Sequence, residues 1–191
     1  MQRKILSILF IMLIASCAMQ ETRIYSLNLP PEKKGATFAS DGTVVVLVTS
    51  PRYLAQPYIV YRTSPYQLSI SRYAKWDSSP DEMLRDAFKE AFSPALFKEV
   101  RTSSLVPAGS YSLAIDLKRF ERSDEGDGCF AEIAFEVSLV SPEGKNLLRT
   151  SIARKVRMDD RSFLSLAKGL SAALGEGVQE VSGNVRTSLG Q

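Results

Sequence analysis

Apolar and polar residues alternate in several short stretches of the first half of the chain, which predicts β-strands. Residues 43–49 (TVVVLVT) are an unbroken β-branched run, typical of a strand buried on both faces, so we expect it at the centre of a sheet. Residues 58–63 and 67–72 are two short strands separated by a turn at 64–65, and together they predict a hairpin. Residues 24–27 show a weaker strand-like alternation.

The alternation is clearest later in the chain. Apolar residues alternate with polar ones over residues 111–118 and 131–139, and less cleanly over residues 146–156. Residues 123–128 (SDEGDG) and 141–144 (SPEG) separate these segments. The second connection has proline at its second position and glycine at its fourth, as a type I turn prefers. The three segments therefore predict an antiparallel meander with one solvated face.

The period of the pattern changes after Ser79, where a helix is predicted to begin. Ser79 suits the N-cap, Pro80 the first helical position, and Glu82 completes a capping box. Pro94 ends or kinks this helix, and residues 96–100 then lead back toward the sheet. The apolar residues recur on one helical face: Met83, Leu84, Ala87, Phe88, Ala91 and Phe92.

A second and longer helix is predicted from about Asp160. Three glycines, Gly175, Gly177 and Gly183, weaken it. They either allow the helix to pack closely or let it fray near its end. Its apolar residues remain on one face: Phe163, Leu166, Leu170, Leu174, Val178, Val181 and Val185.

These elements predict an α/β fold, in which two main helices pack against a mixed β-sheet of five or more strands. No internal repeat is visible, and a chain of 191 residues suits a single domain with a substantial core. We assign this domain to residues 43–191. Residues 17–42 contain prolines and glycines and are interpreted as a tether and loop.

The first sixteen residues have the organisation of a signal peptide. Arg3 and Lys4 precede residues 5–14, an apolar stretch too short to span a bilayer but suited to a signal-peptide core. Residues 14–17 (IASC) follow the pattern of a lipobox, which predicts that Cys17 is acylated and anchors the chain to a membrane. Several acyl chains hold a protein stably at a bilayer. The alternatives are an ordinary signal peptide with a chance cysteine, and an uncleaved anchor.

Composition limits the chemistry of the chain. There is no histidine, which removes the commonest general base and metal ligand. Cys17 and Cys129 are the only cysteines, so with Cys17 acylated no disulfide is expected, and Cys129 is predicted to pack as a small apolar residue. Loss of Arg3 and Lys4 lowers the net charge from +3 to +1. No basic stretch is interleaved with aromatics, so nucleic-acid binding has little support.

Acidic residues were the remaining candidates for chemistry. Asp124, Glu125 and Asp127 invite a calcium interpretation, but their spacing does not match an EF-hand loop, and a solvated turn fits better. Glu132 and Glu136 lie on the polar face of one predicted strand, where solvation is expected. Phosphate-binding and nucleophile-elbow motifs are absent from the sequence. We therefore predict no catalytic residue, metal site or cofactor.

Aromatic residues provide the candidates for partner binding. Several crowd a proline-bounded loop and the strand after it, where they either form a partner interface or pack beneath the loop. The single tryptophan either stacks on a ligand or packs in the core. The candidates are Tyr53, Leu54, Tyr58, Tyr61, Arg62 and Trp76. Met83, Phe88 and Phe92 fit core packing better than the lining of a lipid groove.

Residues 51–63 (PRYLAQPYIVYRT) resemble the Pro-x-Tyr-Leu-x-x-Pro-x-Ile-Val-x-Arg segment of the ABC-type transport auxiliary lipoproteins. Residues 25–27 resemble the start of that family after its lipidated cysteine, and residues 115–121 (IDLKRFE) resemble its later strand ending in Arg-Phe. The similarity covers most of the mature chain. It continues between these segments at Leu68, Tyr73, Trp76, Leu84 and Phe88.

The resemblance implies an anticodon-binding-domain-like sandwich and a role in transport. Such lipoproteins are similar to partners of MCE-domain systems, including the paraquat-inducible type, which move phospholipids or other hydrophobic molecules between inner and outer membranes. It implies that the protein is the docking or receiving component at the outer membrane. Ala18, which follows the predicted acylated cysteine, is compatible with sorting to that membrane because it is not the aspartate of a retention signal.

Four functions remain open on the sequence. A docking module predicts a surface for an MCE-domain partner and allows a homo-oligomeric ring. A lipid carrier predicts an apolar cavity. An outer-membrane assembly factor would instead bind a β-barrel protein. A hydrolase is disfavoured by the missing histidine and motifs.

Overall fold

The computed structural model describes residues 21–29, 39–93 and 96–190. The signal peptide at residues 1–16, Cys17, half of the tether and Pro94 lie outside the described residues. Two helices and eight strands follow along the described chain: β1 (Arg23–Tyr25), β2 (Ser40–Thr49), β3 (Tyr58–Ser64), β4 (Gln67–Trp76), α2 (Pro80–Phe92), β5 (Phe97–Thr102), β6 (Tyr111–Glu125), β7 (Gly128–Val140), β8 (Asn146–Arg157) and α3 (Phe163–Ser188).

The strands form one mixed sheet in the order β1-β4-β3-β6-β2-β5, with β7 between β6 and β8. The β3–β4 hairpin and the β6–β7–β8 meander are antiparallel, as predicted. The pairings of β1 with β4, of β2 with β5 and of β2 and β3 with β6 are parallel. The predicted α/β class, a mixed sheet of five or more strands with two main helices, is confirmed.

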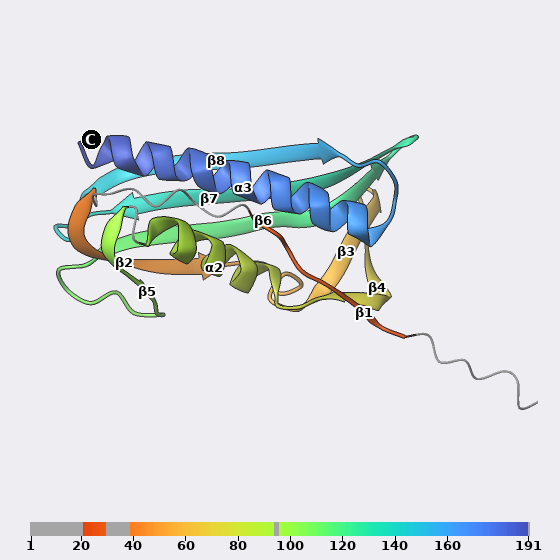
Figure 1. Ribbon diagram of the computed structural model, residues 1–191, viewed down its shortest axis with the longest axis horizontal. Helices are drawn as coiled ribbons and strands as arrows, with labels where there is room; N and C mark the ends of the chain where they lie inside the picture. The colour runs from red at the N-terminus through yellow and green to blue at the C-terminus, as the bar shows by residue number, and fades with distance from the viewer. Residues whose placement is uncertain (1–20, 30–38, 94–95, 191) are drawn as a thin grey trace, which may run out of the picture.

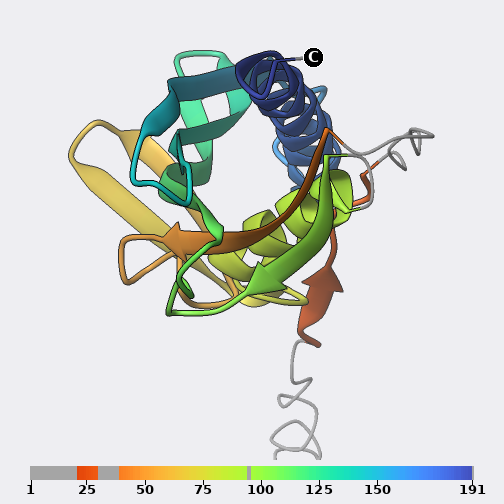
Figure 2. The same ribbon diagram turned by 90° about the vertical axis from the view of Figure 1, so that its left-hand side faces the viewer.

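β6 connects the two halves of the sheet. Its first half pairs with β2 along residues 111–116, and its second half pairs with β3 at Arg122 and Ser123. A bulge between Leu117 and Arg119 separates the two halves, and a bulge bends a strand. The sheet is accordingly strongly curved. Figure 2 shows the strands as an arc whose open side is occupied by α2 and α3.

α2 forms where its capping signal predicts. The Ser79 N–H donates to Oε2 of Glu82 at 3.2 Å, the reciprocal arm of a capping box. Asp81 and Glu82 place negative charge at the positive end of the helix. The predicted apolar face is buried in full, and the helix ends at Phe92, followed by Ser93 as its C-cap.

α3 begins at Phe163 rather than at Asp160. The Ser165 N–H donates to Oγ of Ser162, the N-cap, at 3.1 Å. Asp160 shapes the preceding turn instead, since its Oδ1 accepts from the Ser162 N–H at 2.8 Å. The predicted apolar face is correct, and all its residues after Phe163 are buried.

Glycine allows α3 to approach the meander closely. A Cβ added at Gly169 would lie 2.7 Å from Cβ of Ala131 on β7. One added at Gly177 would lie 3.1 Å from Ile152 Cγ2 and from Phe135 Cζ. Of the two roles left open for the glycines, close packing applies to Gly177. At Gly183 an added Cβ meets nothing within 4 Å.

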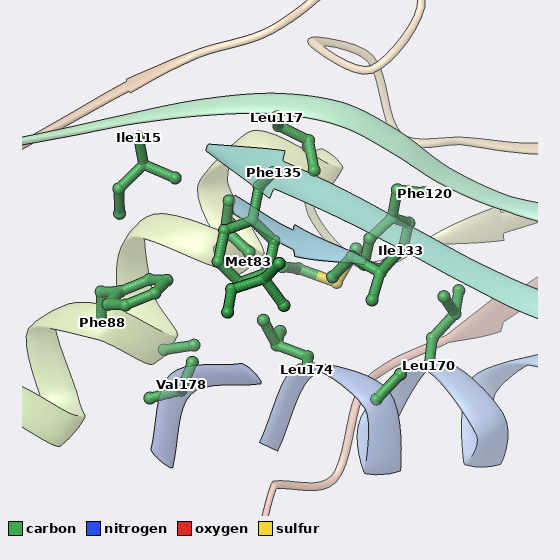
Figure 3. Packing of buried hydrophobic residues seen from close by; sticks show 14 of the residues in the cluster. Met83, Phe88, Ile115, Leu117, Phe120, Ile133, Phe135, Leu170, Leu174 and Val178 are labelled. Carbon is green, nitrogen blue, oxygen red and sulfur yellow. The ribbon is translucent and has the colours of Figure 1, made fainter. Parts of the chain in front are cut away.

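The core lies between the helices and the concave side of the sheet. Phe88 of α2 contacts Phe135 of β7 edge-on at a centroid distance of 5.8 Å. Figure 3 shows side chains from β6 and β7 pointing toward both helices, with Leu170 and Leu174 meeting them from α3. This packing agrees with the predicted core role of Met83, Phe88 and Phe92.

Three expectations about the strands are corrected by the structure. The strand predicted at 43–49 was expected at the centre of the sheet. It is β2, an interior strand between β6 and the edge strand β5, and β6 occupies the centre instead. β5 itself was not predicted. β4 and β6 extend further than expected, to Trp76 and Glu125, so the turn predicted at 123–128 shrinks to Gly126 and Asp127.

Residues assigned to the tether also contact the domain. β1 pairs with β4 at the sheet edge, and Tyr25, Leu27 and Leu29 pack against the core. The Asn28 N–H donates to Oγ of Ser171 on α3 at 3.0 Å. Neither described helix is long and apolar enough to cross a membrane.

Candidate partner-binding surface

The six predicted partner-binding residues separate into two groups. Leu54 and Trp76 are 0% and 2% exposed and belong to the core. The Trp76 ring contacts the Phe120 ring edge-on at 5.5 Å, so the packing alternative describes both residues. Tyr53, Tyr58, Tyr61 and Arg62 are half-buried and keep part of their surface open to solvent.

Arg62 binds a fully buried carboxylate. Its Nε lies 2.8 Å from Oε1 of Glu121, and its Nη2 donates to Oε2 at 3.4 Å. The Glu121 side chain is 0% exposed, whereas that of Arg62 is 26% exposed. The hydrogen bond to Glu121 raises the pKa of Arg62, although partial burial opposes the shift. A two-pronged contact of this kind fixes the orientation of the guanidinium group.

Glu121 faces a second glutamate across the sheet. It pairs in register with Glu132 of β7, and like charges in that position repel. Two further cations offset the repulsion. Nη1 of Arg119 lies 3.0 Å from Glu132 Oε2, and Nζ of Lys155 lies 2.9 Å from Glu132 Oε1.

Lys155 also contacts Glu125. Its hydrogen bonds raise the pKa of Lys155, with the larger effect from Glu125 and the smaller from Glu132. Alternating charges therefore cross from β3 over β6 and β7 to β8. We call this set the charge ladder: Arg62, Glu121, Arg119, Glu132, Lys155 and Glu125.

Tyr53 lies beside one end of the charge ladder. Its loop connects β2 to β3 and is fastened by Leu54, whose N–H donates to the Pro51 carbonyl at 2.9 Å. Burial raises the pKa of Tyr53, and the nearby charge of Glu121 raises it further. Arg62 and Arg119 also line a solvent-open hollow of about 510 Å³ between the β3–β4 turn and the β6–β7 turn. This corner therefore combines an aromatic ring, two cations and a recess.

Tyr61 belongs to the opposite face of the sheet, since successive side chains of a strand alternate. The Arg122 guanidinium lies 4.7 Å from the centroid of its ring. Phe163 of α3 packs against both Tyr61 and Tyr25, at centroid distances of 6.5 and 6.2 Å. Nη1 of Arg122 donates to the Arg161 carbonyl at 2.6 Å. This cluster joins β1, β3 and β6 to the start of α3.

The prediction for Glu132 is wrong, because this side chain is buried and paired rather than solvated, whereas Glu136 is exposed as expected. Glu121, Arg119 and Lys155 were not predicted as site residues. The sequence signal for such residues is a pair of charged residues two positions apart on one strand, as at Arg119 and Glu121, because this spacing places both side chains on the same face. Only the cross-strand register shows that the two glutamates meet.

The described residues offer few other sites. They contain no group of three or more His, Cys, Asp or Glu residues able to hold a metal ion. Asp124, considered for calcium, instead accepts from Nη2 of Arg122 at 3.1 Å. Cys129 is buried, with its Sγ 3.9 Å from the Met158 carbonyl oxygen.

Comparison with solved structures supports the fold. The chain is similar to protein XCC0632 from Xanthomonas campestris, a DUF330 protein, with 22% identity and a TM-score of 0.75 over 86% of this chain and 95% of that one. It is also similar to an uncharacterized protein with 20% identity and a TM-score of 0.65, covering 85% of this chain and 97% of the other. No curated protein matches the chain significantly.

A family model identifies the chain more directly than these structures do. The model of the ABC-type transport auxiliary lipoprotein component matches residues 25–182, which extend from β1 nearly to the end of α3. The match covers far more than half of the chain and includes α2, all but the last six residues of α3, and every described strand except the first two residues of β1. The protein therefore belongs to the family of ABC-type transport auxiliary lipoprotein components.

Proposed function

We propose that this protein is the lipid-anchored, non-enzymatic docking component of an ABC transport system. Its partner is an MCE-domain protein in the periplasm, and the cargo of the system is phospholipid or another hydrophobic molecule carried between the inner and outer membranes. The observation that carries this proposal is the family match over residues 25–182.

The anchor is the acylated Cys17. It lies only six residues before Arg23, the first residue of β1, so the folded domain stays close to its membrane. Ala18 is compatible with sorting to the outer membrane. In this arrangement the domain lies on the periplasmic face of that membrane.

Packing supports docking over lipid carriage. A drug-sized ligand occupies a pocket of about 300–1,000 Å³. The gap between α2 and α3, lined by Leu29, Ala91 and Val178, measures only about 20 Å³, and the larger hollows, such as that of about 510 Å³ beside Arg62, lie open to solvent on the outside of the core. Close packing of the α3 glycines on β7 and β8 likewise leaves little space between helix and sheet. The helices and sheet therefore form a filled core, which suits a rigid docking module.

The charge ladder and Tyr53 are the partner surface that we propose. Each carboxylate of the ladder already contacts a cation, which suits recognition better than proton transfer. Arg119 remains 55% exposed despite its ion pair and is available to an acidic group of a partner. Tyr53 adds aromatic area of the kind enriched at protein interfaces.

The proposal is tested by purifying the acylated protein from its native membrane in mild detergent and identifying the co-purifying proteins by mass spectrometry. We expect an MCE-domain protein, and we expect Cys17→Ser to release the chain from the membrane fraction. Recovery of a β-barrel protein instead, without any MCE-domain protein, would contradict the transport role and support the assembly alternative.

A matched pair of variants tests the surface. Arg119→Ala removes an exposed cation of the charge ladder, and Arg101→Ala removes one of nearly equal exposure, 54%, from the edge strand β5. Partner recovery should fall for R119A and remain unchanged for R101A. Equal recovery with both variants would exclude the charge ladder as the docking site and leave the family role intact.

A further inference from the structure

Another solvent-open hollow lies where two parallel strands end, on elements that do not carry the charge ladder. It measures about 460 Å³ and is lined by residues 46–49 at the end of β2, by Arg85 of α2, and by Thr102, Ser103 and Ser104 at the end of β5. α2 packs against both strands (Figure 1). In open α/β sheets, ligands bind in the crevice outside the carboxyl ends of the strands, so this hollow is a candidate ligand site.

Arg85 supplies a cation to this hollow. It is half-buried in the second turn of α2, and within the described ranges its side chain forms no hydrogen bond or ion pair. The acids one turn earlier are engaged at the start of the helix, because Asp81 and Glu82 both bind Ser79. Asp86 is the next residue along the helix, and adjacent helical residues do not face each other. The guanidinium group of Arg85 therefore keeps its N–H donors available to an anion.

Hydroxyl groups line the same hollow. Thr102 pairs in register with Val46, a core residue, so its side chain lies on the concave side of the sheet, which α2 covers. The hydroxyls of Thr102 and Ser104 form no hydrogen bond within the part of the chain that the structure describes. The Ser103 hydroxyl accepts from the Leu105 N–H at 3.1 Å and keeps its own proton to donate.

β2 also leaves part of its edge open toward the hollow. β5 ends at Thr102, opposite Val46, whereas β2 continues to Thr49. Residues 47–49 pair with β6 on one side and, among the described strands, with none on the other. An open strand edge presents unpaired N–H groups beside its carbonyl groups. The hollow thus combines a guanidinium group, hydroxyls and backbone donors, and its lining residues include no acid, so a phosphate with its several acceptor oxygens fits it.

Exposed apolar residues adjoin these donors. Leu105 and Val106 directly follow Ser104 and are 77% and 40% exposed. Consecutive Cα atoms lie about 3.8 Å apart, so both residues are within reach of a molecule bound in the hollow. Covering them with an apolar group removes their surface from water, which is favourable. A ligand that carries both a phosphate and an apolar chain matches this combination, whereas free phosphate matches only the donors.

We propose that this hollow binds the phosphate group of a phospholipid, with Arg85 as its principal contact. We call it the headgroup site, defined by Arg85, Thr102, Ser103, Ser104, Leu105 and Val106. The hydroxyls donate to the phosphate oxygens that Arg85 leaves free, and the first part of the acyl chains lies against Leu105 and Val106. The proposal rests on phospholipid being the cargo of the proposed transport system. Because the core is filled, the acyl chains stay outside the domain, which contacts the lipid only at its surface.

Photo-crosslinking in the native membrane tests whether lipid reaches the headgroup site. Benzoylphenylalanine is introduced in place of Leu105 in the acylated full chain, and the cells are grown with radioactive phosphate before illumination. We expect a labelled adduct that mass spectrometry identifies as phospholipid. Arg85→Ala should reduce the label about tenfold, because hydrogen bonds to a charged group are lost. Lys89→Ala removes an exposed cation of the same helix that does not line the hollow, and it should leave the label unchanged.

Calorimetry distinguishes a lipid headgroup from free phosphate. The acylated protein in dodecyl maltoside, a detergent without phosphate, is titrated with inorganic phosphate and with glycerophosphoglycerol, the headgroup of phosphatidylglycerol without its acyl chains. We expect glycerophosphoglycerol to bind and R85A to weaken its binding about tenfold, with K89A unchanged. Binding of inorganic phosphate alone would overturn the assignment to lipid.

Two crosslinking results would also contradict the proposal. Equal label in R85A and K89A would mean that position 105 touches lipid without any contribution from Arg85. Absence of a labelled adduct would mean that no phospholipid occupies the hollow. R85A should still recover the MCE-domain protein in the co-purification described above. Loss of the lipid adduct with the partner retained would refute the headgroup site alone, whereas absence of the partner from the unmodified protein would refute the transport role.

Discussion

Replacing Gly169 with alanine should destabilise the protein, whereas the same replacement at Gly183 should stabilise it. Both residues lie in α3, where alanine is favoured over glycine by about 1 kcal/mol. At Gly183 the added methyl group meets no atom within 4 Å, so we expect most of that gain, about 0.5–1 kcal/mol. Gly183 therefore measures helix propensity alone.

At Gly169 the methyl group would lie 2.7 Å from Cβ of Ala131, about 1 Å inside the usual separation of two carbon atoms. The obstacle is a short side chain on a central strand, which cannot rotate away. Overpacking of this kind costs about 1–3 kcal/mol, so after the propensity gain the net loss is about 0–2 kcal/mol. Gly177→Ala should fall between the two, because its contacts of 3.1 Å are with the ends of larger side chains.

Urea and thermal unfolding of the mature protein measure these differences. For a domain of this size, 1 kcal/mol corresponds to a change in Tm of about 2–4 °C. The expected order of stability is G183A, then the unmodified protein, then G169A. In a double-mutant cycle, Ala131→Gly should restore part of the stability lost in G169A, because it removes the opposing methyl group. Equal stability of G169A and G183A, or no coupling to Ala131, would refute the close approach of α3 to β7.

Two further predictions concern the charge ladder. Glu121→Gln should lower the free energy of unfolding by about 2 kcal/mol, which is less than for a fully buried ion pair because Arg62 is 26% exposed and partly hydrated. The control in urea titrations is Glu136→Gln, at an exposed site of β7. Equal urea midpoints for the two variants would contradict the role assigned to the Arg62–Glu121 pair. Stability should also fall in acid through Glu125, because the hydrogen bond from Lys155 lowers its pKa below the ordinary value of 4.5. A carboxylate whose pKa is lowered in the folded state stabilises the protein above its unfolded pKa, and this stabilisation is lost as the pH falls through the folded-state pKa. Glu125→Gln should therefore reduce the fall in urea midpoint between about pH 6 and about pH 3. An unchanged dependence of the midpoint on pH would contradict this assignment.

The parts of the fold that were predicted correctly are those whose signals are local. The capping box at Ser79 and the Pro142–Gly144 turn each specify a start or a reversal within a few residues. β5 was missed because its six residues alternate poorly, and its position depends on the free edge of β2. The parallel pairings join segments far apart in the sequence, so no local pattern encodes them.

The candidate site was harder to predict than the fold. Arg62 and Tyr53 were identified, but their partner Glu121 was not, because a buried carboxylate on a polar face has the same sequence pattern as a solvated one. The bulge after Leu117 also shifts the alternation by one residue, so Phe120 and not Arg119 faces the core. Gly169 was overlooked because small residues in an apolar helical stripe do not reveal what lies opposite.

The central place of β6 determines the order in which the chain can fold. β2 and β3 find their parallel neighbour in β6 only roughly sixty residues later in the sequence, and the backbone after β1 is held by Ser171 of α3. In a chain that emerges from its N-terminus first, β2 and β3 can pair with β5 and β4, but each keeps one edge unpaired until residues 111–125 follow. Closing such long loops slows folding and leaves apolar strands exposed in the meantime. The two halves of the sheet are thus joined only once β6 is available, and the contacts of α3 come last along the chain.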